Sequence, residues 1–357
     1  MKKLVIALIC LFTFFVLVSI CSVLYYKNNL KAVGTDKQVT FVVEQGKTTA
    51  QILKELEDEG LIKSELVGKI YLKLNKGYSP QAGSYELNTN MTFEEIMTKL
   101  SNGDVIDNSI KITFVEGKRL PYFATEINKK FPQYSEEAIL NKLNDKDFIN
   151  QLINKYWFLT DDILKEGIYY PLEGYLFPST YQIKEDATIE DIIYKLLDTT
   201  GAVLNKNKEA IEKSELSIHQ IMTLASIVEL EGASSSDRAG VAGVFYNRIN
   251  NNWTLGSDVT TYYAVKKDFK DELLWVDLQT CNPYNTSAIS NCAFTGLPIG
   301  PICSPGSDSI NGTINPNIDK YFYFVADKNG KTYFNVDEAG HNKTIQELKQ
   351  KGLWYEY

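Results

Sequence analysis

The chain begins with an unbroken hydrophobic run. Residues 4–26 carry no charged side chain and are almost all apolar. A run of this length crosses the hydrocarbon core of a bilayer as one helix. Lysines flank it on both sides, so the positive-inside rule only weakly favours a cytoplasmic tail of residues 1–3. We expect a single-pass anchor in the cell membrane with the rest of the chain extracytoplasmic. A cleaved signal peptide is the alternative, although the run exceeds the usual apolar region of such peptides.

Alternating apolar and polar positions predict a repeat in the first half of the chain. Two strand-like runs end at a glycine and precede an amphipathic pattern, and two others lead to a threonine with an acid three residues later, as in a capping box. These runs are Thr40–Gly46, Ile112–Gly117, Ser84–Leu87 and Thr180–Ile183. We therefore interpret residues 40–100 and 112–197 as two βα…βα units, the second enlarged by an insertion near residues 130–170. Helices on small sheets make an α+β fold. Chance similarity of short amphipathic patterns is the alternative.

Two polar segments mark expected boundaries. Residues 102–109 are polar, contain a glycine and separate the two units, which is typical of a domain boundary. Residues 27–38 follow the apolar run and are expected to form a short polar stalk. About 330 residues lie beyond the anchor, enough for two domains or one large one with a well-buried core.

Composition narrows the chemistry. The formal net charge is −8 and the lysines are scattered, so nothing indicates a nucleic-acid partner. Cys281, Cys292 and Cys303 cannot complete a tetrahedral zinc site by themselves, so we expect no metal, while one disulfide and unpaired thiols both remain open. With His219 and His341 as the only histidines, a Ser-His-Asp triad is hard to assemble. Any catalysis should depend on carboxylates.

One predicted helix carries two candidate acids. It begins after Ser217 as N-cap and ends before Gly232, so Glu229 and Glu231 lie in its last turn. Residues two apart project to nearly opposite sides of a helix, so at most one of them faces a given cleft. The apolar stripe of this helix, Leu224, Ile227 and Val228, continues onto Glu231. Burial and the negative helix end both raise a carboxyl pKa, which favours Glu231 as a proton donor near neutral pH. Two solvated last-turn charges are the alternative.

Two further segments follow this helix. Arg238–Ile249 reads as a helix of small residues that allows close packing, and its arginines could fix a carboxylate or position loops. Leu255–Tyr263 is rich in hydroxyl groups and suits the lining of a sugar groove. Asp258 in this segment could equally be the N-cap of a helix.

Taken together, these motifs resemble the endolytic murein transglycosylases, the MltG or YceG-like family. The matching blocks occur in order along nearly the whole chain. They are Glu173–Tyr181, Leu224–Glu231, Val241–Arg248, Leu255–Tyr262, Pro283–Thr286, Gly296–Gly306, Tyr321–Val325 and His341–Asn342. The resemblance implies an N-terminal transmembrane helix, a LysM-like βα module at residues 39–104 and a YceG-like α+β catalytic domain at residues 110–355.

The resemblance also implies a reaction and a site. Family members cleave the β-1,4 bond between N-acetylmuramic acid and N-acetylglucosamine inside peptidoglycan strands and leave a 1,6-anhydro end, without a cofactor. One glutamate suffices as general acid and then base. Here the motif falls on Glu231, with Glu229 as the alternative. The candidate sugar-binding residues are Asn247, Ser257, Asp258, Thr260, Tyr262, Tyr284 and Asn285. Proteins of wall synthesis or division are candidate partners.

Departures from the family pattern leave other readings open. Many members have a histidine where this chain has Gly330–Phe334, so Thr332 or Tyr333 takes its place. A muramidase would hydrolyse the same bond with Asp258 as second carboxylate. A non-catalytic scaffold would bind peptidoglycan and tether wall-synthesis proteins without cleaving any bond.

Overall fold

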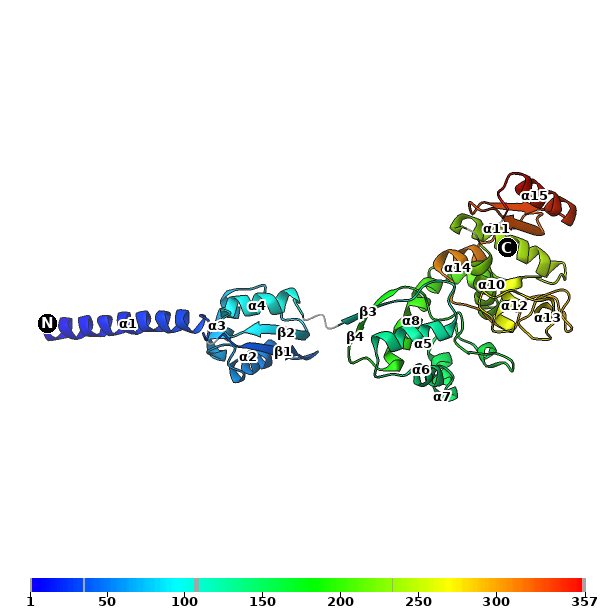
Figure 1. Cartoon of the computed structure of the whole chain (residues 1–357). Coiled ribbons are helices and arrows are strands. Elements are labelled where there is room, and N and C mark those ends of the chain that lie inside the picture. The colour runs from blue at the N-terminus through cyan, green and yellow to red at the C-terminus, as the bar shows by residue number, and fades with distance from the viewer. Residues whose placement is uncertain (1, 35, 106–108, 233, 355–357) are drawn as a thin grey trace. The chain divides into compact units, whose positions relative to one another are not determined.

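The structure is a computed structural model that describes residues 2–34, 36–105, 109–232 and 234–354. It divides into two compact units, Met1–Asn108 and Ser109–Tyr357 (Figure 1). The division lies inside the segment 102–109 that we expected to be a boundary, of which residues 106–108 are outside the described residues.

The first element, α1, is the helix Lys2–Asn29. Within it, Leu4–Asn29 is long and apolar enough to cross a membrane, and none of its most apolar window is buried inside the protein. A membrane span and a signal sequence both have these properties. The helix continues past Tyr26, because the lysine and asparagines that follow are compatible with helical geometry.

The expected polar stalk of residues 27–38 is wrong. Its start, to Asn29, belongs to α1, and described residues after it contact the rest of the first unit. Leu30 contacts the hydrophobic core, and its carbonyl accepts a hydrogen bond from Phe93 N–H at 3.1 Å. Gly34 N–H donates to the Thr89 carbonyl at 3.0 Å, and Lys37 N–H donates to Thr89 Oγ1 at 2.9 Å. Backbone groups that leave water need such partners, so this segment is held in place.

Besides α1, the first unit contains one small sheet and three helices. Its elements are β1 (Gln38–Val43), α2 (Thr49–Asp58), α3 (Glu65–Leu74), β2 (Gly83–Asn88) and α4 (Phe93–Asn102). The strands pair antiparallel, and alternate residues such as Phe41 and Tyr85 are buried under the helices. Capping boxes begin α2 at Thr48 and α4 at Thr92, as the sequence pattern predicts for the latter.

The second unit begins with the same order of elements. They are β3 (Ser109–Thr113), α5 (Leu120–Lys130), α6 (Glu136–Leu143), α7 (Lys146–Lys155), the 3-10 turn η1 (Asp161–Leu164), β4 (Thr180–Lys184), α8 (Ile189–Asn205) and α9 (Lys208–Lys213). β3 and β4 pair antiparallel, and Thr188 caps α8 through Asp191. The order strand, helix, strand, helix therefore recurs as predicted, and the second unit is enlarged: α5, α6, α7 and η1 separate its strands, whereas only α2 and α3 separate β1 and β2.

The rest of the second unit is organised around the helix that carries the two glutamates. Its elements are α10 (Ile218–Glu231), η2 (Ser235–Asp237), α11 (Arg238–Asn250), α12 (Asp258–Ala264), α13 (Trp275–Leu278), α14 (Ser307–Ile314), β5 (Tyr323–Ala326), β6 (Thr332–Asn335) and α15 (Glu338–Gln350). Ser217 caps α10 and Gly232 follows it, as predicted. Residues on both sides of α10 are buried, so it lies between two hydrophobic clusters. The described strands form three two-stranded antiparallel sheets, and the mixture of helices and strands agrees with an α+β class.

Candidate active site

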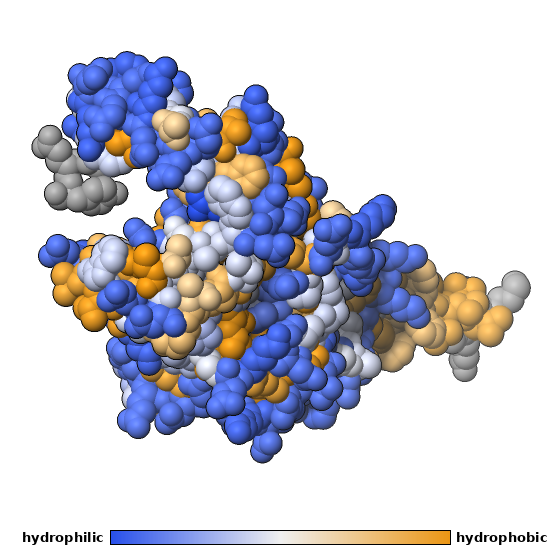
Figure 2. Space-filling view, turned by 90° about the vertical axis from the view of Figure 1, so that its right-hand side faces the viewer, coloured by the Kyte–Doolittle hydropathy of each residue, from blue (hydrophilic) through white to orange (hydrophobic). Residues whose placement is uncertain are grey.

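A cavity of about 1000 Å³ opens in the second unit. Figure 2 shows the molecule hollowed beneath its mostly hydrophilic upper part, with hydrophobic residues gathered on the part that faces the hollow. Residues from α10, α11 and α12 form one part of the lining, and the segment after α12, strand β5 and helix α15 form the rest. The charged and aromatic lining residues include Glu231, Arg248, Asp258, Tyr262, Phe269, Tyr323 and His341.

Glu231 is the last residue of α10 and is half-buried in the cavity wall. Ser257 Oγ donates a hydrogen bond to its Oε1 at 2.6 Å. Burial raises the pKa of Glu231, and the nearby charge of Asp258 raises it further, whereas the Ser257 hydrogen bond and the Arg248 guanidinium lower it. The net shift is upward, so a proton is held here more readily than on an exposed glutamate.

Glu229 lies on another side of the same helix and has different surroundings. Its side chain is 6% exposed and forms an ion pair with Arg238. Its Oε2 also accepts hydrogen bonds from Ser309 Oγ at 2.7 Å and from Gly306 N–H at 2.9 Å. These bonds connect α10 to α11 and to the start of α14, so the carboxylate of Glu229 serves to hold these helices together. As the helical geometry predicts, the two carboxyls project to different sides.

Arg248 and Asp258 shape the cavity next to Glu231. Arg248 donates from Nε to the Phe322 carbonyl at 2.9 Å and from its guanidinium to the Leu255 carbonyl, which joins α11 to the chain before β5 and before α12. Asp258 is the first residue of α12, whereas Ser257 occupies the N-cap position, which corrects the alternative that Asp258 is the cap. Burial raises the pKa of Asp258.

Four predicted sugar-binding residues lie elsewhere. Thr260 and Asn285 are buried and hydrogen-bond to Thr286 and Thr261, respectively, at 2.8 Å each. Tyr284 is fully buried in a cluster of aromatic rings, with its centroid 4.8 Å from that of Tyr263. These residues support the fold because their polar atoms are already paired inside the protein.

Asn247 is the fourth predicted contact that lies outside the cavity of Glu231. It donates to the Tyr321 carbonyl at 2.8 Å and to the Asp319 carbonyl, and it lines a separate cavity of about 180 Å³. The cavity that contains Glu231 brings together only Asp258 and Tyr262 from the predicted contacts. Ser257 is 3% exposed and does not line this cavity, but its hydroxyl donates a hydrogen bond to Glu231.

The wall formed by β5 and α15 contains two family blocks, Tyr321–Val325 and His341–Asn342, to which the sequence assigned no role in the site. Tyr323 and His341 lie there with ring centroids 5.4 Å apart. His341 Nδ1 is buried and has no hydrogen-bond partner among the described residues, and burial lowers the pKa of this histidine. By contrast, Thr332 and Tyr333, which replace the family histidine, donate to Asp237 and Asp327 and do not line this cavity.

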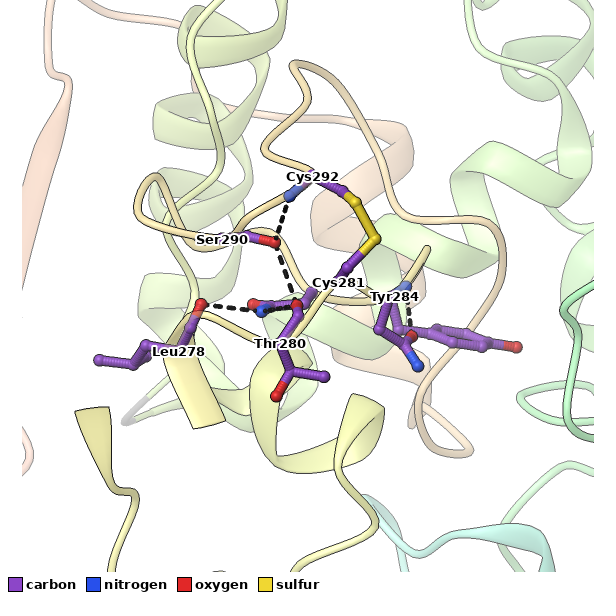
Figure 3. The surroundings of a disulfide bond; sticks show 8 residues. Leu278, Thr280, Cys281, Tyr284, Ser290 and Cys292 are labelled. Carbon is purple, nitrogen blue, oxygen red and sulfur yellow. Dashed lines mark hydrogen bonds between the residues drawn. A yellow bond between two sulfur atoms is a disulfide. The ribbon is translucent and has the colours of Figure 1, made fainter. Parts of the chain in front are cut away.

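The structure gives the state of the cysteines and the arrangement of potential metal ligands. Cys281 and Cys292 form a disulfide (Figure 3), and Cys303 is a buried free thiol, which decides what the sequence left open. Within the described ranges, no group of three or more histidine, cysteine or acidic side chains is arranged to hold a metal ion.

The cavity presents a desolvated carboxyl, that of Glu231, at the end of a helix, which suits general acid–base catalysis. The model of the YceG-like family matches residues 41–347. The chain belongs to the YceG-like family, which confirms the resemblance seen in the sequence.

Named relatives and a solved structure agree with this assignment. The chain is similar to the endolytic murein transglycosylase of Bacillus subtilis, with 36% identity over 90% of this chain and 88% of that protein. A protein of the same name from Streptococcus pneumoniae is 33% identical over 88% of this chain, which spans only 59% of that longer protein. The 2.6 Å crystal structure of a yceG-like protein from Listeria monocytogenes has a TM-score of 0.61 at 32% identity, covering 87% of this chain and 100% of that one.

Proposed function

We propose that this chain is a lytic transglycosylase that cleaves the β-1,4 bond between N-acetylmuramic acid and N-acetylglucosamine within peptidoglycan strands. The observation that carries the proposal is the position of Glu231, a half-buried carboxyl with a raised pKa in a cavity of about 1000 Å³. The names of the relatives from B. subtilis and S. pneumoniae support the same substrate class.

The proposed reaction needs only one carboxyl group. Glu231 in its protonated form donates its proton to the oxygen of the glycosidic bond, and the bond to C1 of the muramic acid breaks. The resulting carboxylate then accepts the proton of the C6 hydroxyl, whose oxygen attacks C1 and closes the 1,6-anhydro ring. The proton balance is restored without a water molecule as nucleophile. Burial favours the protonated form at the start, and the Ser257 hydrogen bond stabilises the carboxylate formed midway.

Substrate contacts are proposed for the residues that share the cavity with Glu231. Asp258 and Tyr262 remain from the original set, and Phe269 adds an aromatic ring that can pack against a sugar face. Tyr262 is held in place because its hydroxyl donates to the Asp271 carbonyl at 2.9 Å. Glu229 is the alternative acid, but its oxygen is occupied by Arg238, Ser309 and Gly306.

The remaining parts of the chain fit an enzyme of the cell wall. We assign α1 as a membrane anchor that leaves residues 110–355 as an extracytoplasmic catalytic domain, and we assign the first unit, residues 39–104, as a LysM-like module that binds glycan. The length and apolar character of α1 support the first assignment. The antiparallel β1–β2 pair covered by α2 and α4 supports the second. Proteins of wall synthesis or division are the proposed partners.

A muramidase is the second candidate, because Asp258 lies beside Glu231 in the same cavity and its charge affects the pKa of Glu231. In that case Asp258 would activate a water molecule or form a covalent intermediate, and the product would have a free reducing end. A non-catalytic scaffold would bind strands and release nothing.

Mass spectrometry of released glycan fragments tests the proposal. The full chain in detergent micelles is incubated with purified peptidoglycan, alongside Glu231→Gln and the matched variant Glu229→Gln. We expect anhydro-ended fragments from the wild type and at least about a thousandfold fewer from Glu231→Gln, because an amide cannot donate a proton. Glu229→Gln should keep cleavage wherever it stays folded. Reducing ends would establish a hydrolase, and an active Glu231→Gln would exclude Glu231 as the acid.

A further inference from the structure

A loop closed by a disulfide lies next to the candidate acid. Cys281 and Cys292 are bonded across a sequence separation of 11 (Figure 3). Both cysteines are exposed, whereas the chain between them contains the buried run Tyr284–Ser287. The disulfide that closes this loop, residues 281–292, is therefore accessible to reagents in solution, whereas the run Tyr284–Ser287 within the loop is part of the protein interior.

Hydrogen bonds fix the closed loop to the chain before it. Asn285 Nδ2 donates to the Leu278 carbonyl at 3.0 Å and to the Thr280 carbonyl at 2.8 Å. Ser290 Oγ donates to the same Thr280 carbonyl at 3.0 Å (Figure 3). The two sides of the loop thus meet at Thr280, next to the disulfide, so the disulfide and these bonds hold the same closed shape.

The buried part of the loop supports the start of α12. Gly256 N–H donates to the Thr286 carbonyl at 3.0 Å, and Ser257 N–H donates to Thr286 Oγ1 at 3.2 Å. Ser257 then donates from its hydroxyl to Glu231 at 2.6 Å. A continuous series of contacts therefore runs from the disulfide through Thr286 and Ser257 to the carboxyl group.

We propose that the Cys281–Cys292 disulfide is a positioning device for the reaction: it holds Thr286 so that Ser257 is fixed against Glu231, and its reduction lowers the rate of cleavage. The proposal rests on the proposed function in taking Glu231 as the acid. A dithiol reductant would act by attacking one cysteine sulfur, which releases the other as a thiolate. Its second thiol then displaces the first cysteine, so that the protein gains two thiols and the reductant becomes a disulfide.

Hydrogen–deuterium exchange tests the structural half without any need for catalysis. The full chain in detergent micelles is compared before and after treatment with dithiothreitol, with thiol counting to verify reduction. We expect the amides of Gly256 and Ser257 to exchange about tenfold faster after reduction, because the disulfide then no longer helps the hydrogen bonds of the loop to hold their acceptors on Thr286. Amides of α8 should be unchanged. The double variant C281S/C292S should behave like the reduced protein. Unchanged exchange at Gly256 and Ser257 after complete reduction would overturn the proposal.

Kinetics test the catalytic half. Reduction should lower kcat by a larger factor than it raises KM, since Ser257 contacts the acid itself, whereas Asp258 and Tyr262 of α12 supply only part of the substrate-binding wall. The rate of cleavage should decline as rising pH removes the proton of Glu231. Reduction should move this decline to higher pH, because the Ser257 hydrogen bond lowers the pKa of Glu231. Ser257→Ala should show this shifted decline already and should not respond to dithiothreitol. Cys303→Ala keeps the disulfide and should respond like the wild type.

The two measurements fail in distinguishable ways. Equal kcat and an unmoved decline with pH for oxidised and reduced protein would refute the positioning role even if exchange changes. If the oxidised wild type releases no fragments at all, the proposed function fails instead, and the exchange experiment by itself then decides whether the disulfide holds Ser257.

Discussion

Glu173 is a buried carboxyl that the proposed mechanism does not use, and it should make the second unit less stable as pH rises. Its side chain is 1% exposed. Leu120 N–H donates to Oε1 at 2.9 Å, and Tyr263 Oη donates to Oε2 at 3.0 Å. Burial raises the pKa of Glu173 to about 7, although these hydrogen bonds and the Arg119 charge oppose the shift.

The size of the effect follows from the two pKa values. Below the ordinary value of 4.5 the carboxyl is protonated in the folded and unfolded chain alike, so pH has no effect through this group. Between 4.5 and about 7 the unfolded chain has lost the proton that the folded chain keeps, so the free energy of unfolding falls with pH. At about 1.4 kcal/mol for each pKa unit, the total loss is about 3 kcal/mol, complete above the folded pKa.

Glu173→Gln should remove this dependence, because the amide does not titrate and can accept from the same backbone N–H. Thermal unfolding of the full chain is followed by tryptophan fluorescence, since all four tryptophans lie in the second unit. Between pH 4.5 and pH 8, the Tm of the variant should rise by roughly 6–12 °C relative to the wild type. Glu185→Gln makes the same chemical change at an exposed site and should follow the wild type. Parallel pH curves for the wild type and Glu173→Gln would refute the reasoning.

Three further substitutions test the packing of the site. Glu229→Gln should lower the free energy of unfolding by about 3 kcal/mol, measured by urea titration, because it leaves the Arg238 charge buried without its ionic partner; a change below about 1 kcal/mol would contradict this. Gly243→Ala should cost about 2 kcal/mol in the same titration, since a Cβ would overlap the Asn317 carbonyl and this outweighs the helical gain of about 1 kcal/mol; a stabilised variant would be the opposite result. Glu231→Gln should unfold at a slightly higher temperature than the wild type at neutral pH, because it removes a desolvated carboxyl, and a lower Tm would count against burial as the cause of its raised pKa.

Local patterns in the sequence predicted the local structure well. The capping box at Thr188, the N-cap at Ser217 and the division of residues 40–197 into two similar units could all be read from neighbouring residues, because caps, turns and strand alternation depend on side chains a few positions apart. The different directions of Glu229 and Glu231 also followed from helical geometry alone.

What sequence reasoning missed depends on contacts between distant segments. Polar and aromatic residues near the site, such as Thr260, Tyr284 and Asn285, suggested sugar contacts, but each is buried and paired with residues of another segment. The stalk was misjudged because polar residues after an apolar run do not reveal that Leu30 returns to a core built from residues further along the chain.

The sequence by itself determined the apolar first helix, the two similar units of residues 40–197, the helix with its pair of candidate acids and the family, since these follow from periodicity and ordered motifs. Only the tertiary structure shows what surrounds each acid. Glu229 is occupied by Arg238 from α11 and by groups around α14, whereas Glu231 is bounded by Ser257 and the open cavity. Charge pairing, desolvation and disulfide closure act through space between residues far apart in the chain, so no local pattern can specify them.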